Sequence, residues 1–443
     1  MNQQSNLDGK TNYKSAFVLV VMLFFMWGFI TVLVDSLIPR LKEIFDLTYS
    51  QAGLVQFAFF MAYGLLSIPA GFILARIGYK KGILLGLTTM GVGCLLFWPA
   101  ASSRTFVVFL VGYFVLAGGM TILQVAANPY VSVLGEPKGA SSRLNLSQAF
   151  NSVGTTIAPM VGAMFILSDN ILTGDEISTL GEVERLSYFS AEASAVQSPF
   201  IILAIALLAL AALVALAKLP QVLKTKNSGS YASALKNSKL TKGALGIFVY
   251  VGAEVAIGSY LVNYFLDMNL AETILSSKFL FSISASVLNT SDLNSIDPKG
   301  IVGAFVMFYW GGAMVGRFIG AYLTNIMSPA KVLGGFAAGA VMMIIASMTT
   351  SGVVAMVSIL AVGLFNSIMF PTIFTIAIED LGDLKPQGSG ILCTAIVGGA
   401  FIPPLYGYLS DLAGFKLALI LLVICYGYIL FYALRGHQST IVK

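Results

Sequence analysis

The chain has 443 residues, of which 57% are apolar and only 10% are charged, and its formal net charge is +5. Soluble domains are usually about 45–50% apolar and about 25% charged, so this composition excludes a soluble globular protein and a disordered one. Three cysteines are too few for a disulfide scaffold. The cations stand in short clusters between long apolar runs, which argues against nucleic acid as a partner. The composition is that of a protein embedded in a lipid bilayer.

Long apolar runs recur along the whole chain. A helix needs about 20 residues to cross about 30 Å of hydrocarbon. Twelve runs meet this length, at Ser15–Leu37, Gln51–Ala75, Gly82–Ala100, Thr105–Leu134, Leu144–Leu167, Pro199–Leu216, Gly243–Asp267, Gly300–Thr324, Ala330–Thr349, Gly352–Glu379, Gln387–Ser410 and Phe415–Leu434. The first run is too long for a signal peptide and lacks a cleavage site. The sequence therefore predicts an all-α membrane protein with twelve transmembrane helices.

The twelve predicted helices divide into two sets of six. The longest basic segment, 218–242, contains Pro, Gly and Ser residues and is typical of a linker. Ala158-Pro159 in the fifth span has a counterpart at Pro403-Pro404 in the eleventh, which indicates an internal repeat. We expect two pseudo-symmetric six-helix bundles, residues 1–217 and 243–443, with cytoplasmic termini because the cations favour that side.

Two acids lie inside predicted spans, where an ionisable group costs several kcal/mol unless it faces a cavity or a partner. Asp35 lies in the outer part of the first span, on the face of Thr31 and Trp27. Glu254 lies near the middle of the seventh span, on the face of Tyr250. A carboxylate in a cavity can bind H⁺ or Na⁺ reversibly, so both acids are candidate cation-coupling residues. The alternatives are an interfacial acid at Asp35 and a structural hydrogen-bonded acid at Glu254.

Neutral amides inside the spans form a second pattern. An amide presents donors and an acceptor together, which a hydroxyl-rich sugar needs, and an aromatic ring can cover the sugar's C–H face. The candidate substrate-binding residues are Gln56, Gln124, Asn128, Gln148, Asn151 and Asn366, with Trp27 or Tyr250 over the sugar ring. The alternative for each single amide is a hydrogen bond between helices.

Residues for other kinds of chemistry are missing from the spans. The only histidine, His437, lies in the C-terminal tail, which excludes a His-based triad or metal site in the membrane. Gly316–Gly320 places two glycines four residues apart, which predicts helix packing rather than a phosphate loop. The three cysteines predict buried, reduced thiols. We expect no enzyme activity, no cofactor and no metal site, with Na⁺ at Asp35 or Glu254 as the one alternative.

Several stretches resemble a known group of proteins. Gly71-Phe-Ile-Leu-Ala-Arg76-Ile-Gly78-Tyr-Lys80-Lys81 is similar to the conformational loop motif between spans two and three of the major facilitator superfamily. The stretches Asp35–Pro39, Gln124–Gly135, Arg143–Ser152 and Tyr250–Glu254 resemble the fucose permease and glucose/galactose transporter family of bacterial sugar symporters.

The resemblance implies the major facilitator fold, in which two rocking halves enclose a central cavity lined by helices one, four, seven and ten. In that family the acid matching Asp35 is implicated in cation coupling, and the residues matching Gln148 and Asn151 line the sugar cavity. The fucose permease has Glu where this chain has Gln124, and Gln where it has Glu254. This departure favours the glucose/galactose branch.

We therefore expect a monomeric secondary transporter in a bacterial inner membrane, with a sugar and the bilayer as its partners. It would import a neutral hexose, such as glucose, galactose, mannose or an N-acetylhexosamine, by symport with H⁺, or alternatively with Na⁺. Two other functions remain open, an L-fucose-type proton symporter and a drug-efflux antiporter of the same superfamily. The antiporter would have a more apolar cavity.

Overall fold

The computed structural model describes residues 13–35, 49–103, 105–165, 179–220 and 230–437, and these residues form helices and no strands. A helix satisfies every backbone N–H and C=O within its own segment, which lipid requires. The first half of the chain contains α1 (Tyr13–Asp35), α3 (Tyr49–Ile77), α4 (Tyr79–Ser103), α5 (Phe106–Val133), α6 (Ala140–Phe165) and α8 (Glu182–Leu216). The second half contains α10 (Ser238–Asp267), α14 (Val306–Ile326), α15 (Pro329–Thr349), α16 (Gly352–Asn366), α17 (Met369–Ile378), α18 (Lys385–Thr394), α19 (Gly398–Ala413) and α20 (Phe415–Phe431).

The predicted number of membrane helices is confirmed. Within the described residues, eleven helical stretches are long and apolar enough to cross a bilayer. The helix α6 is not among them, because amides and hydroxyls along its first half lower its hydropathy. It nevertheless packs lengthwise between α1 and α14, inside the bundle where lipid does not reach its polar face. With α6, the part of the chain that the structure describes contains twelve membrane helices.

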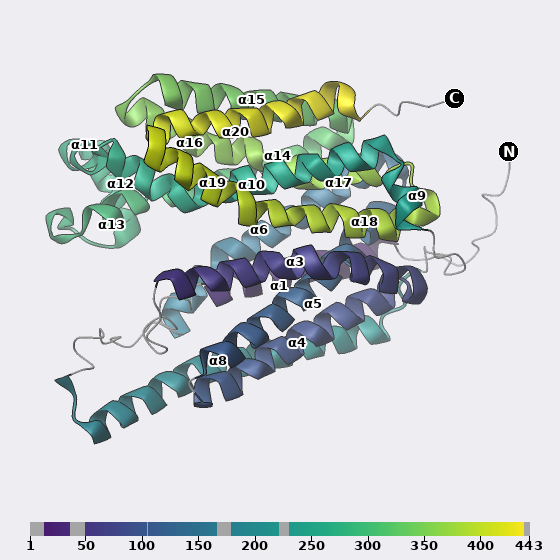
Figure 1. Cartoon of the computed structure of the whole chain (residues 1–443), viewed down its shortest axis with the longest axis horizontal. Coiled ribbons are helices and arrows are strands. Elements are labelled where there is room, and N and C mark those ends of the chain that lie inside the picture. The colour runs from purple at the N-terminus through teal and green to yellow at the C-terminus, as the bar shows by residue number, and fades with distance from the viewer. Residues whose placement is uncertain (1–12, 36–48, 104, 166–178, 221–229, 438–443) are drawn as a thin grey trace.

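The helices form two bundles (Figure 1). The first-half helices gather in the lower part of the view and the second-half helices in the upper part, and the short helix α9 (Tyr231–Leu235) lies at the right-hand end. Part of the predicted linker is thus helical, because α9 lies within it and α10 already begins at Ser238. The bundles meet mainly along two helix pairs, α3 with α18 and α6 with α14, with smaller contacts of α5 with α18 and of α6 with α17.

Two predicted spans are broken rather than continuous. The span at Gly352–Glu379 ends as α16 and resumes as α17 around Ser367, four residues before Pro371. Proline has no N–H, so the Ser367 carbonyl lacks its usual partner. The span at Gln387–Ser410 contains a 3₁₀ turn at Ala395–Val397 between α18 and α19.

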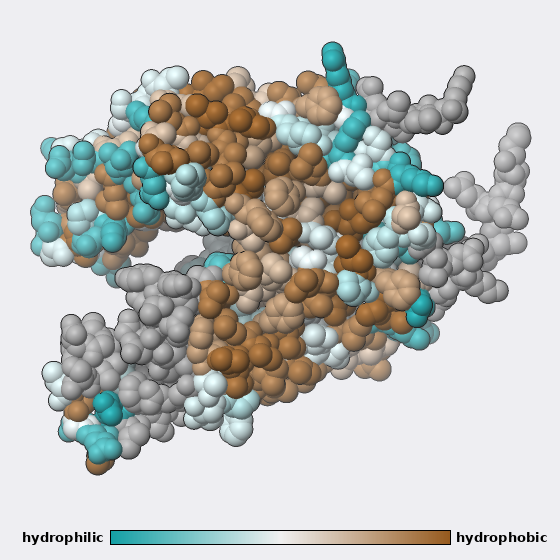
Figure 2. Space-filling view, viewed as in Figure 1, coloured by the Kyte–Doolittle hydropathy of each residue, from teal (hydrophilic) through white to brown (hydrophobic). Residues whose placement is uncertain are grey.

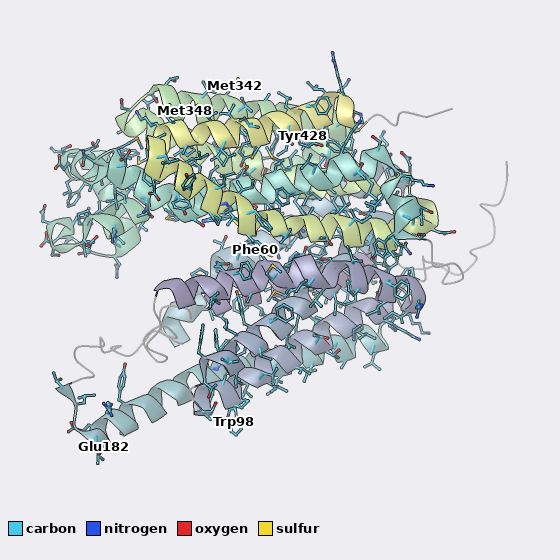
Figure 3. All side chains as sticks on the ribbon, viewed as in Figure 1. Phe60, Trp98, Glu182, Met342, Met348 and Tyr428 are labelled. Atoms are coloured by element: carbon cyan, nitrogen blue, oxygen red, sulfur yellow. The ribbon has the colours of Figure 1, made fainter. Side chains whose placement is uncertain are left out.

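Two predicted loops at the left-hand end of Figure 1 are also helical. The helix of the sixth span begins at Glu182, well before the predicted Pro199, and Glu182 marks its tip in Figure 3. The connection predicted at Met268–Lys299 carries α11 (Leu270–Ser276), α12 (Lys278–Leu288) and the start of α13 (Pro298–Gly303). These added turns are polar or amphipathic and extend beyond the apolar runs from which the spans were predicted.

The space between the bundles is open at one end and closed at the other. Figure 2 shows the surface hollowed between the bundles at the end that carries α11–α13, and continuous at the end that carries α9. Along the closed seam, Phe60 of α3 (labelled in Figure 3) packs against Gly399 of α19. In this view the surface between the bundles is therefore hollowed at the α11–α13 end and not at the α9 end.

Candidate functional site

Glu254 lies in the middle of α10, where an acid needs a cavity or a charged partner. The residue is half-buried, but its Oε1 atom is fully buried and accepts no hydrogen bond from the described residues. The groups that interact with its carboxylate are Tyr250 on the preceding turn, Arg317 and Tyr309 of α14, and Tyr426 of α20. The structure thus surrounds one acid with three phenols and one cation from three helices.

Asn366 closes α16 beside this cluster, and its amide is used by two of the same phenols. It is fully buried, its Nδ2 atom donates to the Tyr309 hydroxyl, and its Oδ1 atom accepts from the Tyr426 hydroxyl. These two bonds engage both ends of the amide. Asn366 therefore fixes the position of two rings beside Glu254.

Arg317 lies in the glycine motif that was predicted to pack helices, and its place in the site was missed from the sequence. Its Nε atom donates to the Ser367 carbonyl at 3.2 Å, the acceptor that Pro371 leaves free. Its Nη1 atom donates across the interface of the bundles to the Gln148 carbonyl at 3.3 Å and to the Ser152 hydroxyl. A cation inside a predicted span was the signal that could have singled it out.

The packing part of that prediction is confirmed for Gly316 and Gly320. A Cβ atom at Gly316 would collide with the Leu364 carbonyl of α16, and one at Gly320 would collide with Ile368. The two glycines therefore let α14 approach α16 and α17 closely. This close approach brings the guanidinium of Arg317 within reach of the Ser367 carbonyl.

The polar stripe of α6 divides between two roles. Asn151 donates from Nδ2 to the Phe24 carbonyl of α1 at 2.9 Å, and its backbone fills the space beside Gly28. Asn145 donates to Thr372 of α17 at 3.1 Å. Gln148 is buried, and no side-chain partner is found for it among the described residues. The structure thus ties two of the amides to neighbouring helices, whereas the Gln148 side chain is not tied to another helix among the described residues.

The amides of α5 lie at the junction of α3, α5 and α18. Gln124 donates from Nε2 to the Tyr63 hydroxyl at 2.5 Å, while its Oε1 atom is buried without an acceptor role. Asn128 is completely buried and lies against Cys393 of α18 in the other bundle. Ser389, also on α18, donates to the Val125 carbonyl at 2.8 Å. These contacts join α5 to α3 and α18, and none of them reaches Glu254.

The described contacts of Trp27 and Gln56 do not include the Glu254 cluster. Trp27 is half-buried, with its ring centroid 5.6 Å from that of Phe24. Thr31, one turn later, donates to the Met120 sulfur of α5 at 3.4 Å, so this face of α1 packs on α5. Gln56 is exposed near the start of α3. The backbone of α1 ends at Asp35, and the Asp35 side chain lies outside the described residues.

The loop motif after α3 holds several elements together at the closed end. Lys80 donates to the Ala215 and Ala217 carbonyls at the end of α8, at 2.7 and 2.9 Å. Gly78 has a φ of +81°, which favours glycine. Arg76 covers the ring of Phe72 at 4.1 Å, and Lys81 is exposed.

Gly71 of the same motif marks a close approach of the bundles. A Cβ atom there would lie 2.7 Å from the Pro386 carbonyl oxygen and would also collide with the Tyr231 hydroxyl. Tyr231 of α9 donates to the Ile68 carbonyl at 2.5 Å, and burial raises the pKa of its phenol. The linker helix thus inserts a hydroxyl between α3 and α18.

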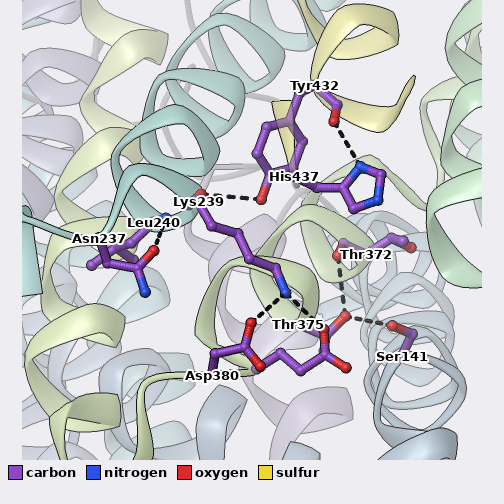
Figure 4. A network of polar contacts seen from close by, with 10 residues as sticks. Ser141, Asn237, Lys239, Leu240, Thr372, Thr375, Asp380, Tyr432 and His437 are labelled. Atoms are coloured by element: carbon purple, nitrogen blue, oxygen red, sulfur yellow. Dashed lines mark hydrogen bonds and ion pairs between the residues drawn. The ribbon is translucent and has the colours of Figure 1, made fainter. Parts of the chain in front are cut away.

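Side chains also join the bundles at the closed end (Figure 4). The Ser141 hydroxyl of α6 shares a hydrogen bond of 2.5 Å with Thr375 of α17. Within the second bundle, Lys239 forms ion pairs with Glu379 at 2.8 Å and Asp380 at 3.0 Å. The closed end is therefore held by directed polar bonds as well as by apolar packing.

A cavity of about 640 Å³ lies near these residues, lined among others by Ser141, Thr375, Lys385 and His437. It contains none of the amides or acids predicted to bind sugar or cation. Within the part of the chain that the structure describes, no three His, Cys, Asp or Glu side chains gather as for a metal ion. All three cysteines are buried and unpaired, as predicted.

The comparisons with known proteins agree with this architecture. The family model described as Major Facilitator Superfamily matches residues 16–402. A protein of Brucella abortus named glucose/galactose transporter is 47% identical over 98% of this chain and 96% of its own length. The L-fucose-proton symporter of Escherichia coli is 33% identical over 97% of this chain and 94% of its own length.

Solved structures lead to the same family. The crystal structure of the transporter FucP in the outward conformation has a TM-score of 0.84 and 32% identity, covering 97% of this chain and 100% of that chain. The proton:xylose symporter XylE, bound to 6-bromo-6-deoxy-D-glucose, has a TM-score of 0.66 at 11% identity, over 95% and 94% of the chains, and shows the fold alone. With its twelve helices in two bundles, the chain therefore belongs to the major facilitator superfamily of membrane transporters.

Proposed function

We propose that this protein imports a neutral hexose by symport with a cation, with H⁺ favoured over Na⁺. The observation that carries the proposal is the carboxylate of Glu254, which stands at mid-span with one buried oxygen that accepts no hydrogen bond. An acid in this position is an expected site for a transported cation. The names of the Brucella abortus and Escherichia coli relatives support a sugar as the second substrate.

Each candidate residue has a proposed role that follows from its surroundings. Glu254 binds the coupled cation, together with Asp35 as a second coupling acid. The side chains of Gln148 and Asn151 bind sugar hydroxyls, with Trp27 or Tyr250 over the ring. A second group of polar side chains lies along α3 and α5, where the substrate would pass on its way to or from the site. This group consists of Gln56, Gln124 and Asn128. Asn366 acts behind the site, since both ends of its amide hold tyrosines.

Transport proceeds by alternating access, in which the two bundles rock about the central site. The open end with α11–α13 then faces outward and the closed end with α9 faces the cytoplasm, with both termini, in a bacterial inner membrane. The motif Gly71–Lys81 controls the closed seam. One charge moving down about 100 mV supplies about 2.3 kcal/mol, or roughly fifty-fold accumulation. A monomer suffices, because one chain contains both bundles.

Uptake by purified protein in liposomes tests this function. Vesicles loaded to give an inward H⁺ gradient, an inward Na⁺ gradient or neither are offered radiolabelled glucose, galactose, mannose, N-acetylglucosamine and L-fucose. We expect accumulation of at least one hexose with only one of the two gradients. Glu254→Gln should abolish accumulation, whereas the exposed Arg185→Gln should not change it. Equal final levels with and without both gradients would refute symport.

The same experiment separates the two other functions. Accumulation of L-fucose alone would assign the L-fucose-type proton symport of the Escherichia coli relative. A drug-efflux antiporter would expel a cationic dye and ignore every sugar. The amides and hydroxyls along the buried face of α6 disfavour this second function, because an apolar drug gains nothing from them.

A further inference from the structure

A half-buried guanidinium joins the two bundles at a point next to the proposed cation site. Arg317 is the one charged residue of α14, and its Nε atom is held inside its own bundle by the Ser367 carbonyl. Because Pro371 has no N–H to donate to that carbonyl, the bond from Arg317 does not compete with a backbone hydrogen bond of the helix. The anchor therefore persists when the bundles move, since both partners belong to the second bundle.

The other end of the same guanidinium is bound across the interface. Its Nη1 atom donates to the Gln148 carbonyl and to the Ser152 hydroxyl, which both belong to α6 of the first bundle. Around this point the pair α6·α14 is packed closely, with Phe150 against Phe318 on one side. Rocking of the bundles changes this packing, so the bonds of Nη1 have to break in each cycle.

A membrane-embedded guanidinium that loses two acceptors needs others, because unsatisfied polar groups in the membrane cost several kcal/mol. The Glu254 carboxylate interacts with Arg317 from the same bundle and has a buried oxygen without a hydrogen bond. Of the phenols around Glu254, Tyr250 also faces Arg317, and it is neutral. Glu254 is therefore the anionic acceptor among the described groups that interact with this guanidinium.

Resting on the function proposed above, we propose that Arg317 is a positioning residue that pivots on the Ser367 carbonyl between α6 and Glu254. In the absence of sugar, when the coupled cation neutralises Glu254, the guanidinium stays on Gln148 and Ser152 and the seam remains closed, so the cation does not cross alone. When the cation leaves, the ionised carboxylate is the stronger acceptor, and the guanidinium moves to it and releases α6. The occupancy of the cation site thereby sets the strength of one bond between the bundles.

The native Cys393 offers a test that needs no sugar. Its thiol is fully buried against Asn128 across the seam, so it becomes accessible only when the α9 end opens. Cys94 and Cys425 lie within single bundles and report unfolding. The purified protein is labelled with N-ethylmaleimide, and the rate at each cysteine is followed by mass spectrometry.

Removing the hydrogen bonds from Arg317 to α6 should raise the rate at which N-ethylmaleimide labels Cys393. A charged hydrogen bond contributes about 1.5–3 kcal/mol, so Arg317→Gln should label Cys393 about tenfold faster or more. Ser152→Ala, which leaves the guanidinium intact, should change it in the same direction by a smaller factor. Arg185→Gln, at an exposed arginine, should match the unchanged protein. Unaltered Cys393 labelling in both Arg317→Gln and Ser152→Ala would overturn the proposal.

The pivot itself is tested with the acid. Glu254→Gln imitates the neutralised acid, so Cys393 should label more slowly, by about threefold or more. Adding Arg317→Gln should abolish this slowing. Additive effects of the two substitutions would refute the competition for one guanidinium. These rates are measured without sugar, so the pivot stands or fails independently of whether the protein takes up a hexose.

Discussion

A methyl group added at Gly390 should open the closed seam. The Cβ atom of Gly390→Ala on α18 would lie 2.8 Å from the Ser67 carbonyl oxygen of α3 and 2.8 Å from the Tyr231 hydroxyl. A carbon atom prefers about 3.5 Å from such neighbours, so α3 and α18 have to separate by about 0.7 Å there. Gly71 lies opposite, with its Cα atom 3.6 Å from the added carbon, and leaves no space for rotation.

The magnitude follows from the cost of overpacking. Extra methyl groups in a packed core cost about 1–3 kcal/mol. The clash exists only while the α9 end is closed, so this free energy shifts the equilibrium toward opening by about 5- to 150-fold. The reaction of Cys393 with maleimide should accelerate by the same factor, since opening precedes labelling.

Two further variants make the test specific. Gly335 lies in the helix α15 with nothing within 4 Å of an added Cβ atom, so Gly335→Ala should leave the Cys393 rate unchanged. Combining Gly390→Ala with Tyr231→Phe removes one of the two clashing oxygens and should recover part of the shift. Equal rates for Gly390→Ala and Gly335→Ala would refute the steric reasoning.

Three other outcomes are expected. Lys239→Met removes the partner of Glu379 and Asp380; because these acids are largely exposed, solvent screening limits the loss to about 1 kcal/mol, measured as a small fall in detergent Tm. An unchanged Tm would show that the ion pairs contribute nothing. Burial raises the pKa of Tyr231, so its phenol should stay protonated and remain a donor at pH 10. The absorbance of tyrosinate at 295 nm, measured as the difference between the unchanged protein and Tyr231→Phe, should therefore not rise as the pH is brought to 10. Asn366→Leu leaves two buried phenols unpaired and should lower Tm by several degrees, since each buried unsatisfied group costs about 1–3 kcal/mol; a Tm within about 1 °C of the unchanged protein would contradict this role.

Hydropathy and composition were sufficient to predict the helices, because lipid imposes one backbone solution on every span. Even α6, whose first half is rich in amides and hydroxyls, was predicted as the apolar run Leu144–Leu167. The early start of α8 at Glu182 was missed, since that part of the helix is not apolar and lies beyond the predicted span. The break at Ser367 was missed because local sequence shows the proline but not the donor that satisfies the freed carbonyl.

The sequence predicted which polar residues lie inside the bundles, but only partly which partner each of them has. An amide in a span predicts a polar partner, but the partner of Asn366 is a pair of tyrosines from α14 and α20, which only the packing brings together. Likewise Asn151 uses its donor on the α1 backbone. Arg317 was visible as an isolated cation, yet its contacts cross from one bundle to the other, and no spacing along the chain reveals such pairs.

The carbonyls freed by proline have a consequence for how this chain tolerates substitution. Ser389 bonds to the Val125 carbonyl, which lies four residues before Pro129, as Arg317 bonds to the carbonyl four residues before its own proline. Each acceptor exists because of a ring on one helix, while each donor stands on another. Replacing Pro129 with alanine would return an N–H to the Val125 carbonyl and make the bond from Ser389 redundant. We therefore expect substitutions at such a proline and at the distant donor to be coupled in evolution.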